Sequence, residues 1–286
     1  MSFRSDSNDS HGGGSGGTPT PVPPSVRPPI KWAGGKTALL DETFADLPTF
    51  GRYLEVFLGG GAPFFKLAPK SAIISDTNAK LINMYVALRD DPHEVVRHLR
   101  MYENTSECFY ATRARNFSVG SAAQRAAEFI AINKTCFNGL HRENQSGQFN
   151  TPFGDNPKAV ICDTNNLLAV SAALQGVDIR VADFEDALKD AQRGDLAYCD
   201  PPYAPLSATS NFTGYQAKGF TVRDQVRLRE LAVALKKRGV RLILSNSHCP
   251  FILELYAGFD IQVVEARRSV NCKGGKRGAV KEVIIR

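Results

Sequence analysis

Several kinds of signal are missing from this sequence, and their absence narrows the class of protein. The six cysteines are scattered, with no CxxC pair and no cysteine and histidine group at the spacing of zinc ligands. No apolar run approaches the roughly 20 residues that a membrane-spanning helix needs, and the N-terminus lacks the apolar segment of a secretion signal. We therefore expect a soluble intracellular protein with reduced thiols, no bound metal and no membrane association.

The chain is basic and long enough for an enzyme. Its net charge of +6 and pI of about 9.0 favour a polyanionic partner, although many basic proteins of this size bind no nucleic acid. With 286 residues, of which 43% are hydrophobic, it can bury a catalytic core and still carry a smaller module. We expect one large domain or two closely packed ones.

Residues 1–29 differ in composition from the rest of the chain. Residues 12–17 are nearly all glycine, and residues 19–29 are rich in proline. Such a segment cannot bury enough apolar surface to offset the conformational entropy that folding removes. We predict a disordered tail over 1–29.

Apolar runs after this tail predict an α/β fold. The strand-like runs lie at residues 53–57, 72–74, 196–199 and 242–244. Helical stretches separate them, and the best marked helix is capped by Thr221 and ended by Gly239. This alternation predicts a doubly wound, Rossmann-like sheet with helices on both faces. Two final runs, 261–265 and 280–285, predict an antiparallel pair at one edge.

The stretch between residues 81 and 175 has another pattern, helical and rich in polar and charged side chains. A turn-rich segment within it, 136–157, predicts a hairpin or long loop. We therefore expect an α/β domain made of residues 30–84 and 176–286, interrupted by a mainly helical insert over 85–175.

A glycine-rich turn, Gly59-Gly60-Gly61, follows the first strand-like run. Backbone without side chains lets a nucleoside approach closely, although a tight structural turn would look the same. Asp76, at the end of the next strand-like run, strengthens the functional interpretation, because a carboxylate there can accept hydrogen bonds from both ribose hydroxyls. The pair predicts a nucleoside site that need not bind phosphate.

The segment Lys31–Thr37 contains the Gly-Lys-Thr of a phosphate-binding loop but does not fit that loop. The loop requires glycine five positions before Gly35, where Ile30 stands, and a strand before it, where this chain is proline-rich. One interpretation is that Lys36 meets the carboxylate of a bound amino-acid moiety while Trp32 walls the pocket. The other is a buried aromatic residue beside a solvated lysine.

The strongest chemical signal is Asp200-Pro201-Pro202-Tyr203, at the carboxyl end of a predicted strand, where open α/β sheets bind ligands. Two prolines remove backbone donors and leave carbonyl oxygens as acceptors. Asp200 and the Pro201 carbonyl would accept the two hydrogens of an exocyclic amine, while Tyr203 stacks on the base. The amine lone pair then points at an electrophile, once the base has left the duplex.

These motifs resemble those of the Dam family of D12-class DNA adenine-N6 methyltransferases, named for enzymes that methylate adenine in GATC. The matching segments are Lys31–Lys36, Phe57–Gly61, Asp76, Phe137–Arg142, Phe149–Gly154 and Asp200–Thr213. The resemblance covers nearly all of residues 30–285. It implies a site-specific DNA-methyltransferase (adenine-specific) that binds S-adenosylmethionine in its α/β domain and reads double-stranded DNA with its helical insert. It also implies that the protein works in the cytoplasm of a bacterium or of a phage-infected cell.

The resemblance assigns roles to single residues. Those expected at the cofactor are Trp32, Lys36, Phe57, Gly59, Gly61, Asp76, Phe184 and Asp200. Those expected in catalysis are Asp200, Pro201, Pro202 and Tyr203. Phe184 follows Asp183 at a predicted strand end and is expected near the adenine of the cofactor.

The loop 136–157 is the expected reader of the target sequence. Arg142 can donate two hydrogen bonds to guanine, Leu140 can contact a thymine methyl group and Phe137 can wedge between bases, although most arginines contact phosphate or solvent. The expected DNA-binding residues are Lys31, Phe137, Asn138, Leu140, Arg142, Pro152, Arg267 and Lys276. By the resemblance Lys31 contacts guanine. The basic residues near the C-terminus are suited to phosphates, although a solvated basic loop would look the same. Two departures are Phe137 in place of tyrosine and Asn156 in place of an aromatic residue.

The expected reaction is direct methyl transfer without a covalent enzyme intermediate, in which the protein supplies positioning and electrostatics. No obligate protein partner is inferred. Two other classes remain open: a methyltransferase of the same fold that acts on RNA or on a protein amide, and a catalytically silent DNA-binding protein. Enzymes of the first class often carry asparagine in place of Asp200.

Overall fold

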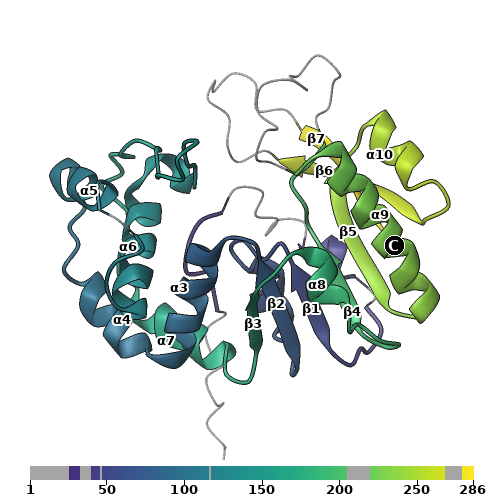
Figure 1. The fold of residues 1–286 in the computed structure, drawn as a ribbon, viewed down its shortest axis with the longest axis horizontal. Helices are drawn as coiled ribbons and strands as arrows, with labels where there is room; N and C mark the ends of the chain where they lie inside the picture. Colours follow the sequence, from purple (N-terminus) through teal and green to yellow (C-terminus); the bar gives the residue numbers. More distant parts are fainter. Residues whose placement is uncertain (1–25, 33–39, 46, 116, 205–219, 268–278) are drawn as a thin grey trace, which may run out of the picture.

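The computed structural model describes residues 26–32, 40–45, 47–115, 117–204, 220–267 and 279–286 (Figure 1). Its strands are β1 (Tyr53–Val56), β2 (Ala72–Asp76), β3 (Asp178–Val181), β4 (Leu196–Cys199), β5 (Arg241–Ser247), β6 (Ile261–Arg267) and β7 (Ala279–Ile285). In the described part of the chain these form one sheet of seven strands, in the order β3-β2-β1-β4-β5-β7-β6. Strands β1 to β5 are parallel, and β7 is antiparallel to both of its neighbours. The predicted α/β sheet with an antiparallel edge pair is confirmed.

The described helices follow the expected alternation with strands. They are α1 (Leu40–Thr43), α2 (Ala62–Leu67), α3 (Ala79–Asp90), α4 (Pro92–Leu99), α5 (Ser106–Arg113), α6 (Ala122–Thr135), α7 (Thr164–Ala173), α8 (Phe184–Leu188), α9 (Val222–Arg238) and α10 (Pro250–Leu255), with a 3-10 turn η1 (Phe137–Gly139). Helix α9 begins with a capping box between Thr221 and Asp224 and ends at Gly239, whose φ of 78° suits glycine. None of the described helices is long and apolar enough to cross a membrane.

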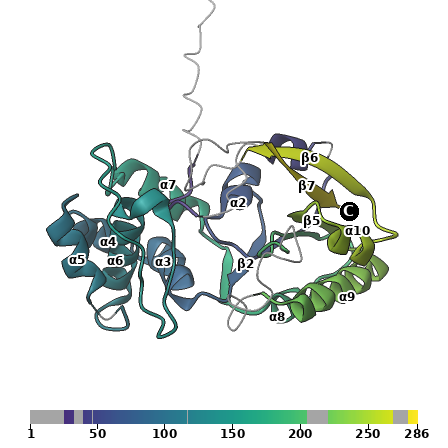
Figure 2. The same cartoon turned by 90° about the horizontal axis from the view of Figure 1, so that it is seen from above.

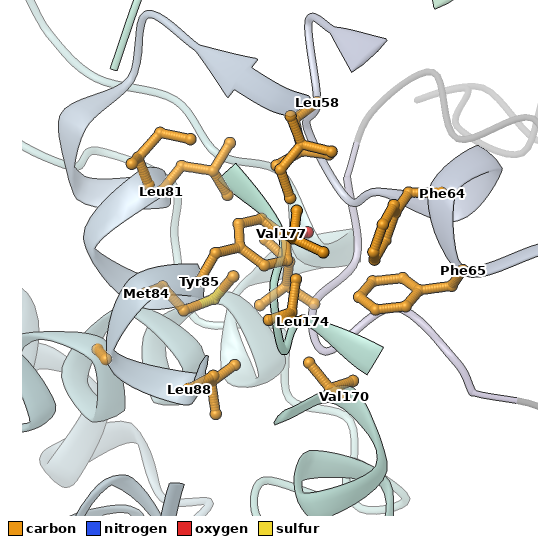
Figure 3. Close-up of a cluster of buried hydrophobic side chains, with 14 of the residues drawn as sticks. Leu58, Phe64, Phe65, Leu81, Met84, Tyr85, Leu88, Val170, Leu174 and Val177 are labelled. Carbon is orange, nitrogen blue, oxygen red and sulfur yellow. The ribbon is translucent and has the colours of Figure 1, made fainter. Parts of the chain in front are cut away.

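The two faces of the sheet bury separate cores, because neighbouring strand residues point to opposite faces. One core joins strand residues such as Tyr53 and Ile74 to helices α2, α3 and α7. Figure 3 shows Tyr85 of α3 facing Phe65 of α2 in this core. The other core joins Leu54 and its neighbours to α8, α9 and α10, and Figure 2 shows α2 and α9 on opposite sides of the sheet.

Helices α4, α5 and α6 lie beside the sheet, next to α3 (Figure 1). The first core is continuous from α2 through α3 into α6, as in the buried series Phe64, Leu88 and Ile130. The predicted boundary between residues 84 and 85 falls inside α3, which packs on β2 and β3 as well as on α6. The division into an α/β domain and a helical insert remains a prediction, and any such parts share α3.

The predicted tail is too long at its C-terminal end. Val26 packs against the first core, and Arg27 forms a 2.7 Å ion pair with Asp163. The backbone N–H of Arg27 also donates to Asn166 Oδ1. The prediction of disorder is therefore wrong for residues 26–29, because buried Ile30 anchors the chain beside them. Residues 1–25 lie outside the described part.

Candidate functional site

The predicted site segments meet at one edge of the sheet, the carboxyl ends of β1, β2 and β4. The glycine turn follows β1, Asp76 ends β2 and Asp200 follows β4. Strand β1 lies between β2 and β4, so the connections from these strands run to opposite sides. Ligands of open α/β sheets bind in the crevice at such a point.

Trp32 explains why the turn needs glycine. Gly59 has φ of 49°, and a Cβ atom on it would lie 2.5 Å from Cδ1 of Trp32. The indole ring therefore lies directly against the turn, in van der Waals contact that any other residue would block. On the other side, the Tyr85 hydroxyl donates to the Gly59 carbonyl at 3.0 Å. The turn is thus held by two aromatic residues, and Gly61, with φ of 67°, is the N-cap residue of α2.

Asp76 is oriented by the turn that it faces. Its Oδ2 accepts from the Gly59 N–H at 3.1 Å and its Oδ1 accepts from the Asn78 N–H at 2.9 Å. Burial raises the pKa of Asp76, and these backbone hydrogen bonds oppose the shift. Each carboxylate oxygen has a second lone pair. With a further backbone hydrogen bond from Thr77, the group can still accept from a hydroxyl while it keeps Gly59 and Asn78.

Aromatic rings gather beside the glycine turn. The Phe57 ring lies 5.6 Å from Phe184 and 5.4 Å from Phe220, centroid to centroid. Phe57 adopts φ of 97°, a strained conformation for a residue with a side chain. The guanidinium of Arg227 lies 4.8 Å from the Phe184 ring centroid and is itself held by Asp183. Phe220 was not identified from the sequence, since an aromatic residue just before a helix cap carries no distinctive signal.

The segment Asp200–Ala204 is held from behind by buried amides that sequence reasoning missed. Gln225 of α9 donates from Nε2 to the Pro202 carbonyl at 3.0 Å. Its Oε1 accepts from Asn246 Nδ2 at 3.0 Å, and both side chains are at most 2% exposed. Ser247 adds a 2.8 Å hydrogen bond from its hydroxyl to the Ala204 carbonyl. A buried amide that loses its partner costs free energy, so this network restrains the segment.

The exposed side of the same segment is also restrained. The Tyr203 hydroxyl donates to Glu282 Oε2 of β7 at 2.9 Å, which fixes its half-buried ring. Asp200 is half-buried. Burial raises the pKa of the neighbouring Cys199, and the negative charge of Asp200 raises it further. A thiol in that state is a poor nucleophile, in agreement with Cys199 as a strand residue.

Glu55 of β1 is a buried acid behind the glycine turn. Burial raises its pKa to about 8, and the charges of Asp200 and Asp76 act in the same direction. Hydrogen bonds from the Tyr53 hydroxyl, at 2.9 Å, and from the Phe64 backbone oppose the shift. Phe64 lies in the first turn of α2. The N-cap residue of this helix, Gly61, has no side chain that could accept from the first N–H groups, so Glu55 helps to hold the helix start.

The loop 136–157 is hairpin-like, with antiparallel bridges Cys136–Phe153 and Glu143–Phe149. It is joined to the N-terminal segment by Asn133 of α6. The Asn133 Oδ1 accepts from the Lys31 N–H at 2.9 Å, and its Nδ2 donates to the Lys31 and Gly139 carbonyls. Lys31 and the loop are therefore brought together, as the DNA-reading prediction requires.

The predicted readers lie mainly on the surface of this loop. Phe137 is 42% exposed, and Asn138, Arg142 and Pro152 are exposed, whereas Leu140 is half-buried. The Arg142 guanidinium is oriented by Asn150, whose Oδ1 accepts from Nε at 2.7 Å.

Other predicted residues cannot be placed at the site. Lys36 and Lys276 lie outside the described residues, and for Arg267 only the backbone in β6 is described. Among the side chains that are described, no group of three or more histidine, cysteine, aspartate or glutamate residues could hold a metal ion.

The fold and the site together define a class of protein. A sheet with parallel order β3-β2-β1-β4-β5, continued by antiparallel β7 and by β6, is a Rossmann-like methyltransferase fold. Acidic residues stand where this fold binds its ligands, at Asp76 and Asp200.

Comparison with known proteins specifies the class further. Residues 32–270 match the family model of the D12 class N6 adenine-specific DNA methyltransferases. The chain is 40% identical over 270 residues to the Type II methyltransferase M1.LlaDCHI of Lactococcus lactis subsp. cremoris, covering 91% of this chain and 95% of that protein. It is 40% identical over 286 residues to the Type II methyltransferase M.MjaIII of Methanocaldococcus jannaschii, covering 91% and 98%. It is 35% identical over 259 residues to the DNA adenine methylase of Escherichia coli K12, covering 89% and 93%.

The chain belongs to the family of D12 class N6 adenine-specific DNA methyltransferases. The identification made from its motifs is confirmed: the protein is an enzyme, its substrate is DNA and its target is adenine N6. The alternatives with an RNA substrate, a protein substrate or no activity are set aside.

Proposed function

We propose that this enzyme transfers the methyl group of S-adenosylmethionine to N6 of adenine in double-stranded GATC. The observation that carries the proposal is the convergence of the glycine turn, Asp76 and Asp200 at one edge of the sheet, with the exposed loop 136–157 joined to the same region through Lys31. The α/β part would bind the cofactor, and the insert 85–175 would read the DNA.

The residues present suit this cofactor. Asp76 keeps a lone pair for a ribose hydroxyl, and Phe57, Phe184 and Phe220 offer an aromatic surface for its adenine. Trp32 lines the glycine turn, and Lys36 would pair with the amino-acid carboxylate. When bound, the cofactor supplies a methyl group made electrophilic by the adjacent sulfonium.

The protein's part in the reaction is to position the target amine. Asp200 and the Pro201 carbonyl accept its two hydrogens, so that its lone pair is free to be alkylated. Gln225 holds the neighbouring Pro202 carbonyl from the interior, which supports Pro201 as the second acceptor. Asp200 also stabilises the positive charge that develops on N6, and the Tyr203 ring stacks on the extruded base.

Target recognition rests on the loop and the N-terminal segment. Arg142 donates to guanine, with Lys31 as a second guanine contact, and Leu140 meets a thymine methyl group. Phe137, exposed at the surface, wedges into the base stack, and Asn138 and Pro152 line the same surface.

Arg267 and Lys276 would contact phosphates. The GATC target is favoured by the resemblance of the motifs to those of Dam enzymes.

One experiment tests target and reaction separately. The enzyme is expressed in a host that lacks DNA methylation, and the methylated sites are mapped across the genome, with Asp200→Ala as the inactive control. Adenine methylation at GATC is expected for the wild type and none for the variant. Methylation of adenine at another motif would overturn the assignment of the loop residues, and absence of adenine methylation would overturn the catalytic assignment.

A further inference from the structure

His141, in the loop 136–157, reaches the residue that lines the cofactor turn. Its imidazole stacks on the Trp32 indole, with ring centroids 5.3 Å apart and an angle of 17° between the planes. Phe129 of α6 and Phe149 of the loop enclose the imidazole, at 5.2 and 5.5 Å. Since Trp32 lies directly on Gly59, one ring stack connects the loop to the glycine turn.

The polar edge of His141 reaches the same site by a second route. Its Nε2 lies 3.5 Å from Nδ2 of Asn78, the residue that caps α3 and whose backbone N–H holds Asp76. Burial lowers the pKa of His141, and in the tautomer that leaves Nε2 without a proton the neutral ring can accept from the Asn78 amide. In the other tautomer Nε2 carries the proton and can donate to Oε1 of Glu143, 3.4 Å away, which also accepts from Lys80 of α3 at 2.6 Å.

These contacts form a closed ring: His141, Trp32, Gly59, Asp76, Asn78 and back to His141. A displacement of the loop is therefore expected to reach the cofactor side, because packed aromatic contacts and part-buried hydrogen bonds do not stretch without loss.

We propose that His141 is a positioning residue that couples the two substrates, so that DNA bound at the loop 136–157 raises the affinity for the cofactor and the cofactor raises the affinity for DNA. This inference rests on the proposed function, which assigns the loop to DNA and Trp32 and Asp76 to the cofactor. The coupling is reciprocal by thermodynamic necessity, and couplings of this kind change affinity about 5-fold to 150-fold.

Trp32 gives a direct reading of the coupling, because it is the only tryptophan of the chain. The probes are S-adenosylhomocysteine, which has no methyl group to transfer, and a short duplex that contains one GATC. Each probe alone is expected to change Trp32 emission in the wild type. The dissociation constant of S-adenosylhomocysteine is expected to fall about 5-fold or more when the enzyme is saturated with the duplex.

His141→Ala is expected to lose both effects of the duplex, so that emission no longer responds to DNA and the ratio of the two dissociation constants approaches one. DNA binding itself, followed by the anisotropy of a labelled duplex, should persist. Gln148→Ala is the matched control, since Gln148 is exposed in the same loop and, within the described residues, forms its side-chain hydrogen bond with Asn144. It should keep the wild-type ratio.

His141→Phe keeps an aromatic ring on Trp32 and removes the nitrogen that faces Asn78, so it decides the question if His141→Ala does not fold. Its ratio is expected to fall between that of the wild type and one. A wild-type ratio in His141→Phe, or in folded His141→Ala, overturns the proposal.

The outcomes separate this inference from the proposed function. A wild-type enzyme that binds neither probe contradicts the proposed function. One that binds both and methylates GATC, with equal dissociation constants in the presence and absence of the duplex, contradicts the coupling alone.

Discussion

Glu55→Gln should make the protein more stable at alkaline pH than the wild type. Glu55 is 1% exposed in β1, and burial raises its pKa to about 8 from an ordinary value of 4.5. The folded state therefore keeps a proton that the unfolded state loses above about pH 4.5. The stabilising effect of this proton is complete below that pH and is lost as the pH rises to about 8.

The size of the effect follows from the shift. At about 1.4 kcal/mol per pH unit, the free energy of unfolding of the wild type should fall by roughly 3 to 5 kcal/mol across this window because of Glu55 alone. Glutamine mimics the protonated acid: its oxygen can accept from the Phe64 N–H and its amide can donate to the Tyr53 oxygen. The variant has no proton to lose at this position.

Urea unfolding of both proteins at pH 5, 6.5 and 8 measures the difference. The two should agree within about 1 kcal/mol at pH 5 and diverge as the pH rises. Asp76, whose pKa is also raised, is present in both proteins, so its own titration lowers the stability of neither protein selectively. Parallel profiles across the whole range would refute the reasoning, because they would mean that Glu55 titrates alike in the folded and unfolded chain.

The remaining predictions concern the site. Gln225→Ala should lower kcat on the order of 10-fold to 100-fold with little change in KM for the cofactor, because a small displacement of the Pro202 carbonyl misplaces the two acceptors of the target amine. Steady-state kinetics measure both constants, and an unchanged kcat would count against a role of the Gln225 network in catalysis. Asp200→Ala should abolish methylation while DNA binding, measured by anisotropy, persists, and near-normal turnover would remove Asp200 from catalysis. Asp76→Ala should weaken S-adenosylmethionine binding by about 1 to 3 kcal/mol in calorimetry, and an equal affinity would move the ribose site elsewhere. Arg142→Ala should still methylate but tolerate substitution of one guanine-cytosine pair, with a loss of about 1 to 3 kcal/mol of discrimination. Lys276→Ala should instead weaken the binding of all DNA sequences alike, which salt titrations of the affinity measure.

Local features of this protein could be predicted from the sequence because their causes are local. The capping box of Thr221 and the helix end at Gly239 depend on residues within one turn of α9. Asp76 and Asp200 could be predicted at one edge because both stand at the carboxyl ends of strands in a parallel sheet. The predicted end of the tail was wrong, since composition does not show that Val26 and Arg27 reach partners far along the chain.

The amino-acid sequence by itself determined the class of fold, the glycine turn and the acid-proline-proline-tyrosine segment, since these follow from hydrophobic periodicity, backbone freedom and side-chain chemistry. Only the tertiary structure decided what holds them. Gln225 and Asn246, from α9 and β5, meet behind Pro202, and His141 meets Trp32 from a distant part of the chain. Such pairs have no fixed spacing in sequence, because they form where separate elements pack, and an ordinary glutamine or histidine carries no local mark of its partner.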